Sequence, residues 1–238
     1  MITTTEIAQY QSPTFDKQFA TANKAGQIAW YPWVGKQYPT SACKVLVILE
    51  SHYINWERNN IEALALPDFT RRIVAEQVFP QYRWNSRTFN NLAACLSGKV
   101  VCKGQISPVW EKVALYNFVQ RPMDSPKERP DKKDFATGWK NFPTVVDIVQ
   151  PDVCIFASMA VISNARKLEF PTHELGVETG ERIGRVKIRK RFTVNTTPDF
   201  QTICVAIKHP GKSFAVDKWR AVLQRQVPQA MKILTLSH

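Results

Sequence analysis

The chain has 238 residues, and its 32 lysines and arginines outnumber its 20 aspartates and glutamates, which gives a formal net charge of +12. A surplus of this size draws a protein towards polyanions, first nucleic acid and then acidic membrane surfaces. Apolar residues make up 44% of the chain, too many for a disordered polycation, so a packed core is expected. No linker or repeat divides the sequence, which predicts a single domain over residues 1–238.

The sequence carries no segment suited to crossing a membrane. Its longest aliphatic run, residues 45–49, is far shorter than the roughly 20 residues of a spanning helix. The N-terminal region also lacks the apolar stretch of a signal peptide, so we expect a soluble, cytoplasmic monomer with no membrane partner. The cysteines form no Cys-x-x-Cys motif, which indicates reduced core thiols and neither a metal nor another cofactor. They are Cys43, Cys95, Cys102, Cys154 and Cys204.

Short apolar runs alternate with helical patterns along the chain. The expected elements are a strand at 44–49, helices at 67–78 and 86–96, a strand at 113–118, a helix at 134–150, strands at 152–157 and 202–207, and a helix from 216. The four strand-like runs are rich in β-branched or aromatic residues and do not alternate, as is typical of parallel strands covered on both faces. This order predicts an α/β fold, a three-layer α/β/α sandwich with a central four-stranded parallel sheet.

Polar clusters follow three of the four predicted strands. Glu50-Ser51-His52-Tyr53 follows the first, Asn117 ends the second, and Lys208-His209-Pro210-Gly211-Lys212-Ser213-Phe214 follows the fourth. In parallel sheets ligands bind beyond the carboxyl ends of the strands, so these clusters are expected to meet in one crevice. A carboxylate, two histidines and an amide gathered there fit acid–base chemistry on a heterocycle.

These motifs, in this order, resemble those of the uracil-DNA glycosylase superfamily. Residues 115–122 (LYNFVQRP), Pro126, Arg129-Pro130 and residues 148–153 (IVQPDV) resemble the asparagine strand, proline-rich loop and third strand of its iron–sulfur branch. His209-Pro210-Gly211 resembles the superfamily's second motif. The resemblance runs from about residue 44 to 225, with an insertion at about 54–110. The branch's cysteine ligands have no counterpart, so no cluster is implied.

The first motif departs from the family pattern. Ser51 stands where the family has an Asp or Asn that positions water, whereas Tyr53 matches the tyrosine beside the C5 edge of the base. The resemblance therefore implies a pocket that differs from the uracil-specific one. The roles it implies are catalysis by Glu50, Ser51, His52 and His209, base binding by Asn117, Tyr53 and Trp56, and DNA binding by Gly211, Lys212, Ser213 and the wedge Phe214.

The densest positive charge lies in residues 182–191 (RIGRVKIRKR), within a predicted hairpin at about 182–195. On a strand, alternate residues stand on one face about 6.6 Å apart, close to the phosphate spacing of a nucleic acid strand. The expected DNA contacts are Arg185, Lys187, Arg189, Lys190 and Arg191; a solvated hairpin face is the alternative. A second basic and aromatic group could read DNA or cap the fold: Arg71, Arg72, Tyr82, Arg83, Trp84 and Arg87.

The sequence favours a DNA glycosylase. It would hydrolyse the N-glycosidic bond of a damaged or modified pyrimidine flipped out of single- or double-stranded DNA, in base-excision DNA repair or in phage defence. One alternative is a catalytically silent nucleic-acid-binding module of the same fold. Another is a hydrolase of free nucleosides, which the basic segment disfavours because a small substrate needs no extended backbone contact.

Overall fold

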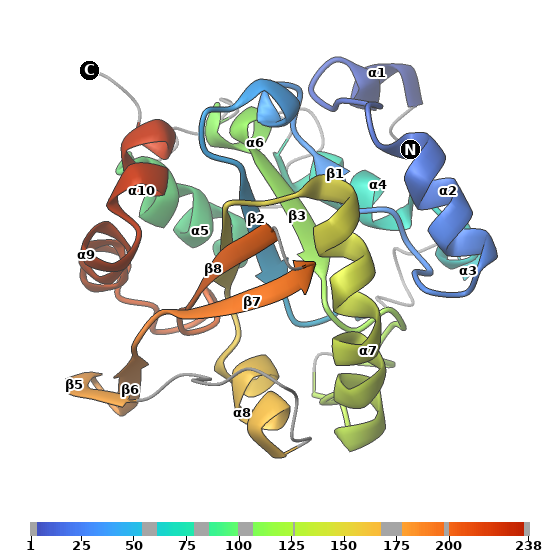
Figure 1. Ribbon diagram of the computed structural model, residues 1–238. Helices are drawn as coiled ribbons and strands as arrows, with labels where there is room; N and C mark the ends of the chain where they lie inside the picture. Colours follow the sequence, from blue (N-terminus) through green and yellow to red (C-terminus); the bar gives the residue numbers. More distant parts are fainter. Residues whose placement is uncertain are drawn as a thin grey trace.

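A computed structural model describes residues 4–53, 61–78, 86–99, 107–125, 127–167, 178–197 and 200–235 (Figure 1). Its helices, in chain order, are α1 (Thr4–Ala8), α2 (Asp16–Lys24), the 3-10 helix η1 (Tyr38–Thr40), α3 (Ile61–Leu64), α4 (Phe69–Val78), α5 (Arg87–Ser97), α6 (Val109–Lys112), α7 (Lys132–Val149), α8 (Met159–Lys167), α9 (Val216–Gln226) and α10 (Pro228–Leu234). Its strands are β1 (Trp33–Val34), β2 (Val45–Leu49), β3 (Val113–Asn117), β4 (Val153–Phe156), β5 (Glu178–Ile183), β6 (Val186–Arg189), β7 (Phe192–Thr197) and β8 (Phe200–Ala206). The α/β class is confirmed.

The main sheet has six strands in the order β1-β3-β2-β4-β8-β7, where the sequence predicted four. β2 pairs in parallel with β3 and β4, and β4 pairs in parallel with β8. The edge strands β1 and β7 are antiparallel to their neighbours, so the sheet is mixed. The edge strands were missed because β1 has only two residues and β7 (FTVNTT) is largely polar, whereas the prediction relied on continuous apolar runs.

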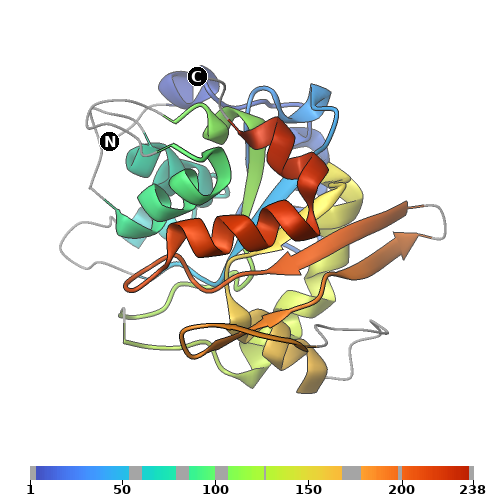
Figure 2. The same ribbon diagram turned by 90° about the vertical axis from the view of Figure 1, so that its left-hand side faces the viewer.

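Helices cover both faces of this sheet, so the fold has a hydrophobic core on each face. Strand β2 contributes side chains to both cores. Val45, Val47 and Leu49 belong to the core that includes residues of α5, α9 and α10. Leu46 and Ile48 belong to the core that includes residues of α2, α7 and α8. Figure 2 shows α9 and α10 in front of the strands. Because alternate side chains enter opposite cores, β2 needs an unbroken apolar run.

Helix α7 packs closely against the chain that follows β3. Its first turn is closed by a capping box, in which Asp131 accepts from the Asp134 N–H at 2.8 Å and Asp134 accepts from the Asp131 N–H at 2.9 Å. Further along, a side chain in place of Gly138 would collide with Phe118, just after the end of β3. Glycine therefore lets α7 approach the carboxyl end of the sheet closely.

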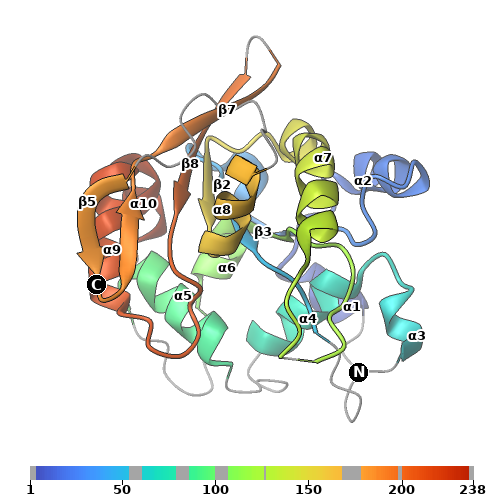
Figure 3. The same ribbon diagram turned by 90° about the horizontal axis from the view of Figure 1, so that it is seen from below.

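The basic hairpin has different bounds from those predicted. Its strands are β5 and β6, which form a two-stranded sheet in the described residues, while residues 192–197 belong to the main sheet as β7. The turn contains Gly184, at φ 59°, and Arg185, so Arg185 is not on a strand face beside Lys187 and Arg189. Figure 3 shows the hairpin beside α9, and Arg225 of that helix donates to Glu181 of β5 at 2.8 Å.

Three further predictions concern α5, the cysteines and membrane-spanning helices. The helix predicted at 86–96 is α5, but the Ser86 side chain makes no capping hydrogen bond. Cys43, Cys95, Cys154 and Cys204 are free and buried; Cys102 lies outside the described residues. Within those residues, no helix has both the length and the apolar character needed to cross a membrane.

Candidate functional site at the carboxyl ends of the strands

Four polar residues lie at the carboxyl ends of the four parallel strands, along the same edge of the sheet. Glu50 follows β2, Asn117 ends β3, Ser158 comes two residues after β4, and His209 follows β8. Two cavities open at this edge, of about 1090 Å³ and about 510 Å³, here called the large and the small cavity. They adjoin, because the same residues line both: Glu50, Ser51, Tyr53, Thr88, His209, Gly211 and Lys212.

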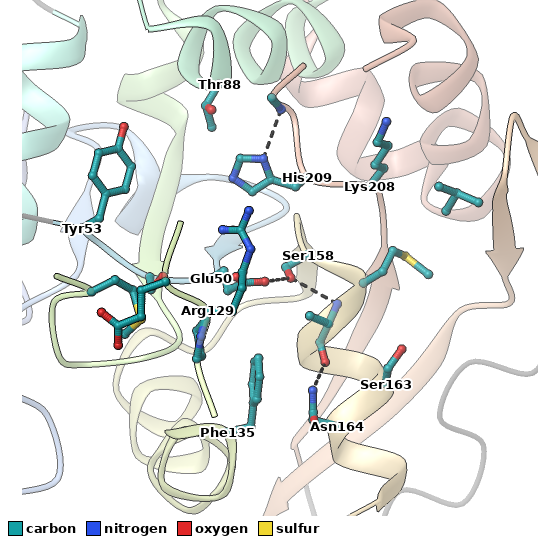
Figure 4. A pocket seen from close by; sticks show the side chains of 18 of the residues that line it. Glu50, Tyr53, Thr88, Arg129, Phe135, Ser158, Ser163, Asn164, Lys208 and His209 are labelled. Atoms are coloured by element: carbon teal, nitrogen blue, oxygen red, sulfur yellow. Dashed lines mark hydrogen bonds between the residues drawn. The ribbon is translucent and has the colours of Figure 1, made fainter. Parts of the chain in front are cut away.

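The Glu50 carboxylate is held by a hydrogen bond from the neighbouring strand end. The Ser158 hydroxyl donates to its Oε2 at 2.6 Å, and the same hydroxyl oxygen accepts from the Ala160 N–H at 3.2 Å (Figure 4). Because a hydroxyl has one hydrogen, these bonds orient Ser158 towards Glu50. The carboxylate is therefore fixed at the wall that the two cavities share.

The backbone determines which residues of the first motif face the cavities. The N–H groups of Phe118 and Val119 donate at 2.9 Å to the carbonyls of Leu49 and Glu50, so the motif runs on beside the chain after β3. In this register Glu50 and Ser51 line both cavities. The sequence left open which motif residue faces the crevice, and this arrangement places Glu50 and Ser51 there together.

His52 is packed into the wall of the small cavity. Its ring lies 5.4 Å from the Trp30 ring and 5.1 Å from the Phe69 ring, and its Nε2 bonds the Thr70 hydroxyl at 3.0 Å. Burial lowers the pKa of His52 from 6.5 to about 3, so the ring is neutral. These contacts argue against the catalytic role predicted for His52, since its ring packs against Trp30 and Phe69 and its Nε2 is hydrogen-bonded to Thr70.

His209 presents a defined tautomer. The backbone N–H of Gly211 donates to its Nδ1 at 3.2 Å. A backbone N–H can only donate, so Nδ1 is the acceptor and the proton of the neutral ring lies on Nε2. Partial burial is the largest cause that lowers the pKa of His209; Glu50 opposes this shift, and Arg129 and Lys208 reinforce it. The ring is thus a neutral N–H donor at the shared wall.

The loop that carries His209 is anchored to the insertion. The Asn91 side chain, on α5, donates to the carbonyls of Pro210 and Gly211 at 2.9 and 3.2 Å. Lys208 reaches across the same loop and donates to the Ser213 carbonyl at 2.8 Å. These bonds hold the loop in a tight turn, in which Ser213 adopts φ 60°.

Two predicted DNA contacts in this loop need correction. The Gly211 N–H is bonded to His209, so it is not available to a phosphate. Phe214 is only 9% exposed and stacks on Trp219 with the ring planes 12° apart, which makes it a core residue and not a wedge. Lys212 is exposed at the cavity wall and remains a candidate DNA contact.

Asn117 is a buried amide in the wall of the small cavity. Its side chain is 1% exposed, and neither Oδ1 nor Nδ2 has a hydrogen-bond partner among the residues that the structure describes. Its backbone is braced by Gln120, which donates to the Asn117 carbonyl at 2.6 Å and accepts from the N–H groups of Ala29 and Trp30. A buried amide without a partner costs free energy, so its presence beside a cavity points to a ligand.

The small cavity combines this amide with apolar walls. Leu49, Ile73, Phe89 and Leu115 contribute its apolar lining, and Gln77 of α4 contributes a second amide. The other lining residues are mostly polar and include Glu50, Arg87 and His209. The Gln77 Oε1 is also buried and without a partner in the described part of the chain. An apolar wall that faces convergent polar groups suits a small organic ligand that is itself partly polar.

Five cations line the large cavity, together with the carboxylates of Glu50 and Glu128. Arg129, Lys187, Arg189, Lys208 and Lys212 all reach its wall, from three separate parts of the chain. Lys187 and Arg189 belong to β6, so part of the predicted basic segment does lie at the site. Arg185, Lys190 and Arg191 do not line either cavity.

The second basic and aromatic group predicted from the sequence contains both structural and cavity-lining residues. Arg71 is buried against Asp16 at 2.6 Å and Arg72 bonds Asp68 at 2.9 Å, so both stabilise the fold. Arg87, by contrast, lines the small cavity. Three members, and the predicted base contact Trp56, lie outside the described residues: Tyr82, Arg83 and Trp84. Tyr53 is 54% exposed beside both cavities, where its ring can stack on a ligand.

Reasoning from the sequence missed Ser158 and Gln77. Ser158 follows the third predicted strand, so inspecting that strand end as well would have found it. Gln77 sits in the insertion, where no motif marks it. In the described residues no group of three His, Cys, Asp or Glu side chains is placed to hold a metal ion. Comparison of the chain with models of known protein families and with curated proteins found no match.

Proposed function

We propose that this protein is a DNA glycosylase-like enzyme with a fold of the uracil-DNA glycosylase type, in which helices flank a parallel strand core. Its substrate is a modified or damaged pyrimidine flipped out of DNA, in base-excision repair or in defence against phage DNA. The order of the motifs supports this proposal. So does the parallel pairing of β3, β2, β4 and β8, which puts Glu50, Asn117 and His209 at one sheet edge.

The observation that carries the proposal is the Asn117 amide in the small cavity, which has no hydrogen-bond partner among the described residues. An amide offers a donor and an acceptor side by side, which matches the Watson–Crick edge of a base. A volume of about 510 Å³ accommodates one base with room to spare. Since the flipped base leaves its partner strand, its edge needs new hydrogen bonds, which Asn117 supplies.

The shared wall supplies the groups for hydrolysis. Water attacks C1′ of the sugar while the bond from C1′ to the base nitrogen breaks, and the bonding electron pair leaves with the base. Glu50, held by Ser158 at 2.6 Å, accepts the proton of the water and stabilises the positive charge that develops on the sugar. The Nε2–H of His209 donates to the base oxygen, where negative charge develops.

The large cavity holds the strand from which the base has flipped. Its cations suit the phosphates on either side of the flipped nucleotide, as charge-assisted hydrogen bonds to phosphate are strong. Its volume, about twice that of the small cavity, also leaves room for a substituent on the base. This division of roles gives a function to the part of the positive charge that lines the large cavity.

A base-release assay tests the proposal. The protein is incubated with duplexes that contain cytosine, uracil, hydroxymethylcytosine or glucosylated hydroxymethylcytosine, and abasic sites are detected by alkali cleavage and released bases by mass spectrometry. We expect release from at least one modified duplex. The Glu50→Gln variant should lose about 100-fold or more of the rate, the usual contribution of a general base.

The matched control is Glu62→Gln, an exposed glutamate on α3 that lines neither cavity. It should release base at the wild-type rate. Equal rates for the wild type and Glu50→Gln would remove Glu50 from the mechanism. No release from any duplex, with DNA binding retained, would favour the silent binding module. That second candidate rests on Ser51, which lines both cavities without the carboxylate or amide of the family motif.

A further inference from the structure

The small cavity is lined by two amides, from different elements, whose side-chain oxygens have no partner in the part of the chain that the structure describes. Asn117 ends β3, whereas Gln77 lies near the end of α4, in the insertion that the family resemblance does not cover. Both line the same cavity, and both have buried side-chain oxygens without a partner among the described residues. The resemblance gives a role to Asn117 alone, so Gln77 is a feature of this chain.

These amides set a hydrogen-bond requirement for the ligand. The two oxygens, Asn117 Oδ1 and Gln77 Oε1, each need a donor, and Asn117 Nδ2 needs an acceptor. Water meets such needs in a free cavity, but a ligand that displaces the water must replace its bonds or bind weakly. A well-matched ligand therefore brings at least two donor hydrogens and one acceptor on the edge that enters the cavity.

Bases differ in how well they meet this requirement. In a nucleoside, uracil has one N–H on its Watson–Crick edge, between two carbonyl acceptors, so one of the buried oxygens stays unpaired. Cytosine has an amino group with two hydrogens next to an acceptor ring nitrogen, and the amino group can serve both oxygens. A site built to pair with such a group discriminates strongly against a base that lacks it.

We infer that the small cavity selects a base with an exocyclic amino group, of the cytosine type, and that Gln77 is a specificity-determining residue that accepts from that amino group. This inference rests on the proposed function, because it takes the ligand of the small cavity to be a base. It narrows the substrate class from modified pyrimidines in general to those that keep the amino group.

Binding measurements test this inference without needing turnover. The probes are short single-stranded oligonucleotides of abasic spacers with one central base: cytosine, uracil, or 2-pyrimidinone, which keeps the ring nitrogen but lacks the amino group. Their affinities are measured with Glu50→Gln protein, in which base release should be slow compared with binding. We expect cytosine to bind about 10- to 100-fold more tightly than uracil or 2-pyrimidinone, as expected when a buried acceptor is left unpaired.

A methionine substitution then isolates Gln77, since Gln77→Met keeps the side-chain length and removes the acceptor. It should erase the preference for cytosine, because cytosine loses a hydrogen-bond partner and uracil no longer leaves the Gln77 oxygen unpaired. The matched control, Gln224→Met on the exposed face of α9, should keep the preference. Thermal melting of each variant confirms its folding, and the three-probe comparison holds without any substitution at Gln77.

The outcomes separate the inference from the proposed function. Equal binding of the three probes, tighter binding of uracil, or a preference that survives Gln77→Met would overturn the inference. If duplexes release uracil fastest, the enzyme proposal stands and the inference falls. If the probes show the cytosine preference but no duplex releases a base, the inference stands and hydrolysis is excluded for those substrates.

Discussion

The two cavities at the sheet edge differ in what they offer to a ligand. The small cavity has an apolar wall, the buried Asn117 amide and the buried oxygen of Gln77, which suit a flat heterocycle. The large cavity has a cationic wall that includes Lys187 and Arg189, which suits phosphate. Under the proposed function, this difference assigns recognition of the base and retention of the strand to separate surfaces.

The boundary between the cavities is where chemistry is expected. Glu50 and His209 line both, so they face the position where the sugar would join a base in the small cavity to phosphates in the large one. Substitutions in the boundary, the cationic wall and the apolar wall should therefore have different consequences. The rate of base release, the affinity for DNA, the stability of the protein and the positioning of His209 can therefore be measured separately.

The largest effect is expected at the boundary, from His209→Ala. Loss of the Nε2–H removes a donor to the departing base, and such donors are worth about 100-fold or more in rate. DNA affinity should stay near the wild-type value, because the cationic wall is intact. Single-turnover base release and equilibrium binding measure the two quantities.

The same residue predicts a pH profile. Because burial lowers the pKa of His209 below 6.5, the neutral ring persists into mildly acidic solution. Protonation would place a hydrogen on Nδ1, opposite the Gly211 N–H that it now accepts, and would break that bond. The release rate should be flat above pH 6.5 and fall below it, with a midpoint under 6.5. His209→Gln, which keeps an N–H donor, should lack this fall; the same fall in that variant would assign it to another group.

The next effect concerns the cationic wall. Arg129, Lys187 and Lys212 are exposed there, and replacing all three with Gln should weaken DNA binding about tenfold or more at moderate salt. The slope of log K against log salt concentration should become shallower by up to about 0.9 for each lost phosphate contact with duplex DNA.

The control for the cationic wall makes an equal change of net charge elsewhere. Lys17, Lys24 and Lys232 are exposed on α2 and α10 and line neither cavity. Their replacement with Gln should leave the salt slope almost unchanged. Equal losses in the two triple variants would mean that overall charge, and not the cavity, holds the DNA.

A third effect concerns His52, in the wall of the small cavity, and changes the free energy of unfolding. The unfolded chain protonates His52 near pH 6.5, whereas the folded chain does so only at about 3. The unfolded state thus binds more protons between these values, so the free energy of unfolding falls as the pH drops through this window. The slope from this group is at most about 1.4 kcal/mol per pH unit.

His52→Gln isolates that contribution. The variant should be less stable at pH 7, because the contacts with Trp30 and Phe69 are altered, but it should lose less stability between pH 6.5 and 4.5. Urea unfolding over this range measures both. A wild-type slope in the variant would show that His52 is protonated to the same extent in both states.

The sequence anticipated the strand core well, because fully buried parallel strands require unbroken apolar runs such as residues 45–49 and 113–117. It also pointed to Glu50, Asn117 and His209, since polar residues directly after such runs are held at the sheet edge. Contacts between distant segments could not be predicted. The stacking of Phe214 on Trp219 and the burial of the Gln77 oxygen depend on how α9 and α4 pack on the sheet.

The turn of the basic segment escaped prediction for a different reason. Alternation of Arg185, Lys187 and Arg189 with smaller residues fits one strand, but Gly184 readily adopts the positive φ of a tight turn. The chain therefore reverses at Gly184-Arg185, and the three cations are not on one face. Local pattern alone does not distinguish these arrangements when a glycine lies within the pattern.

The smallest effect is expected from Gly211→Ala, which acts on the position of His209. A Cβ at this position would lie 3.0 Å from His209 Nδ1 and 3.4 Å from Cε1, so the ring must move by a few tenths of an ångström. If a displacement of 1 Å reduces the rate about 100-fold, this shift should reduce it about fourfold. Adding Gly211→Ala to His209→Ala should cause no further loss, because the ring that it displaces is gone. An undiminished fourfold loss in the double variant would mean that Gly211 acts on the DNA directly and not through His209.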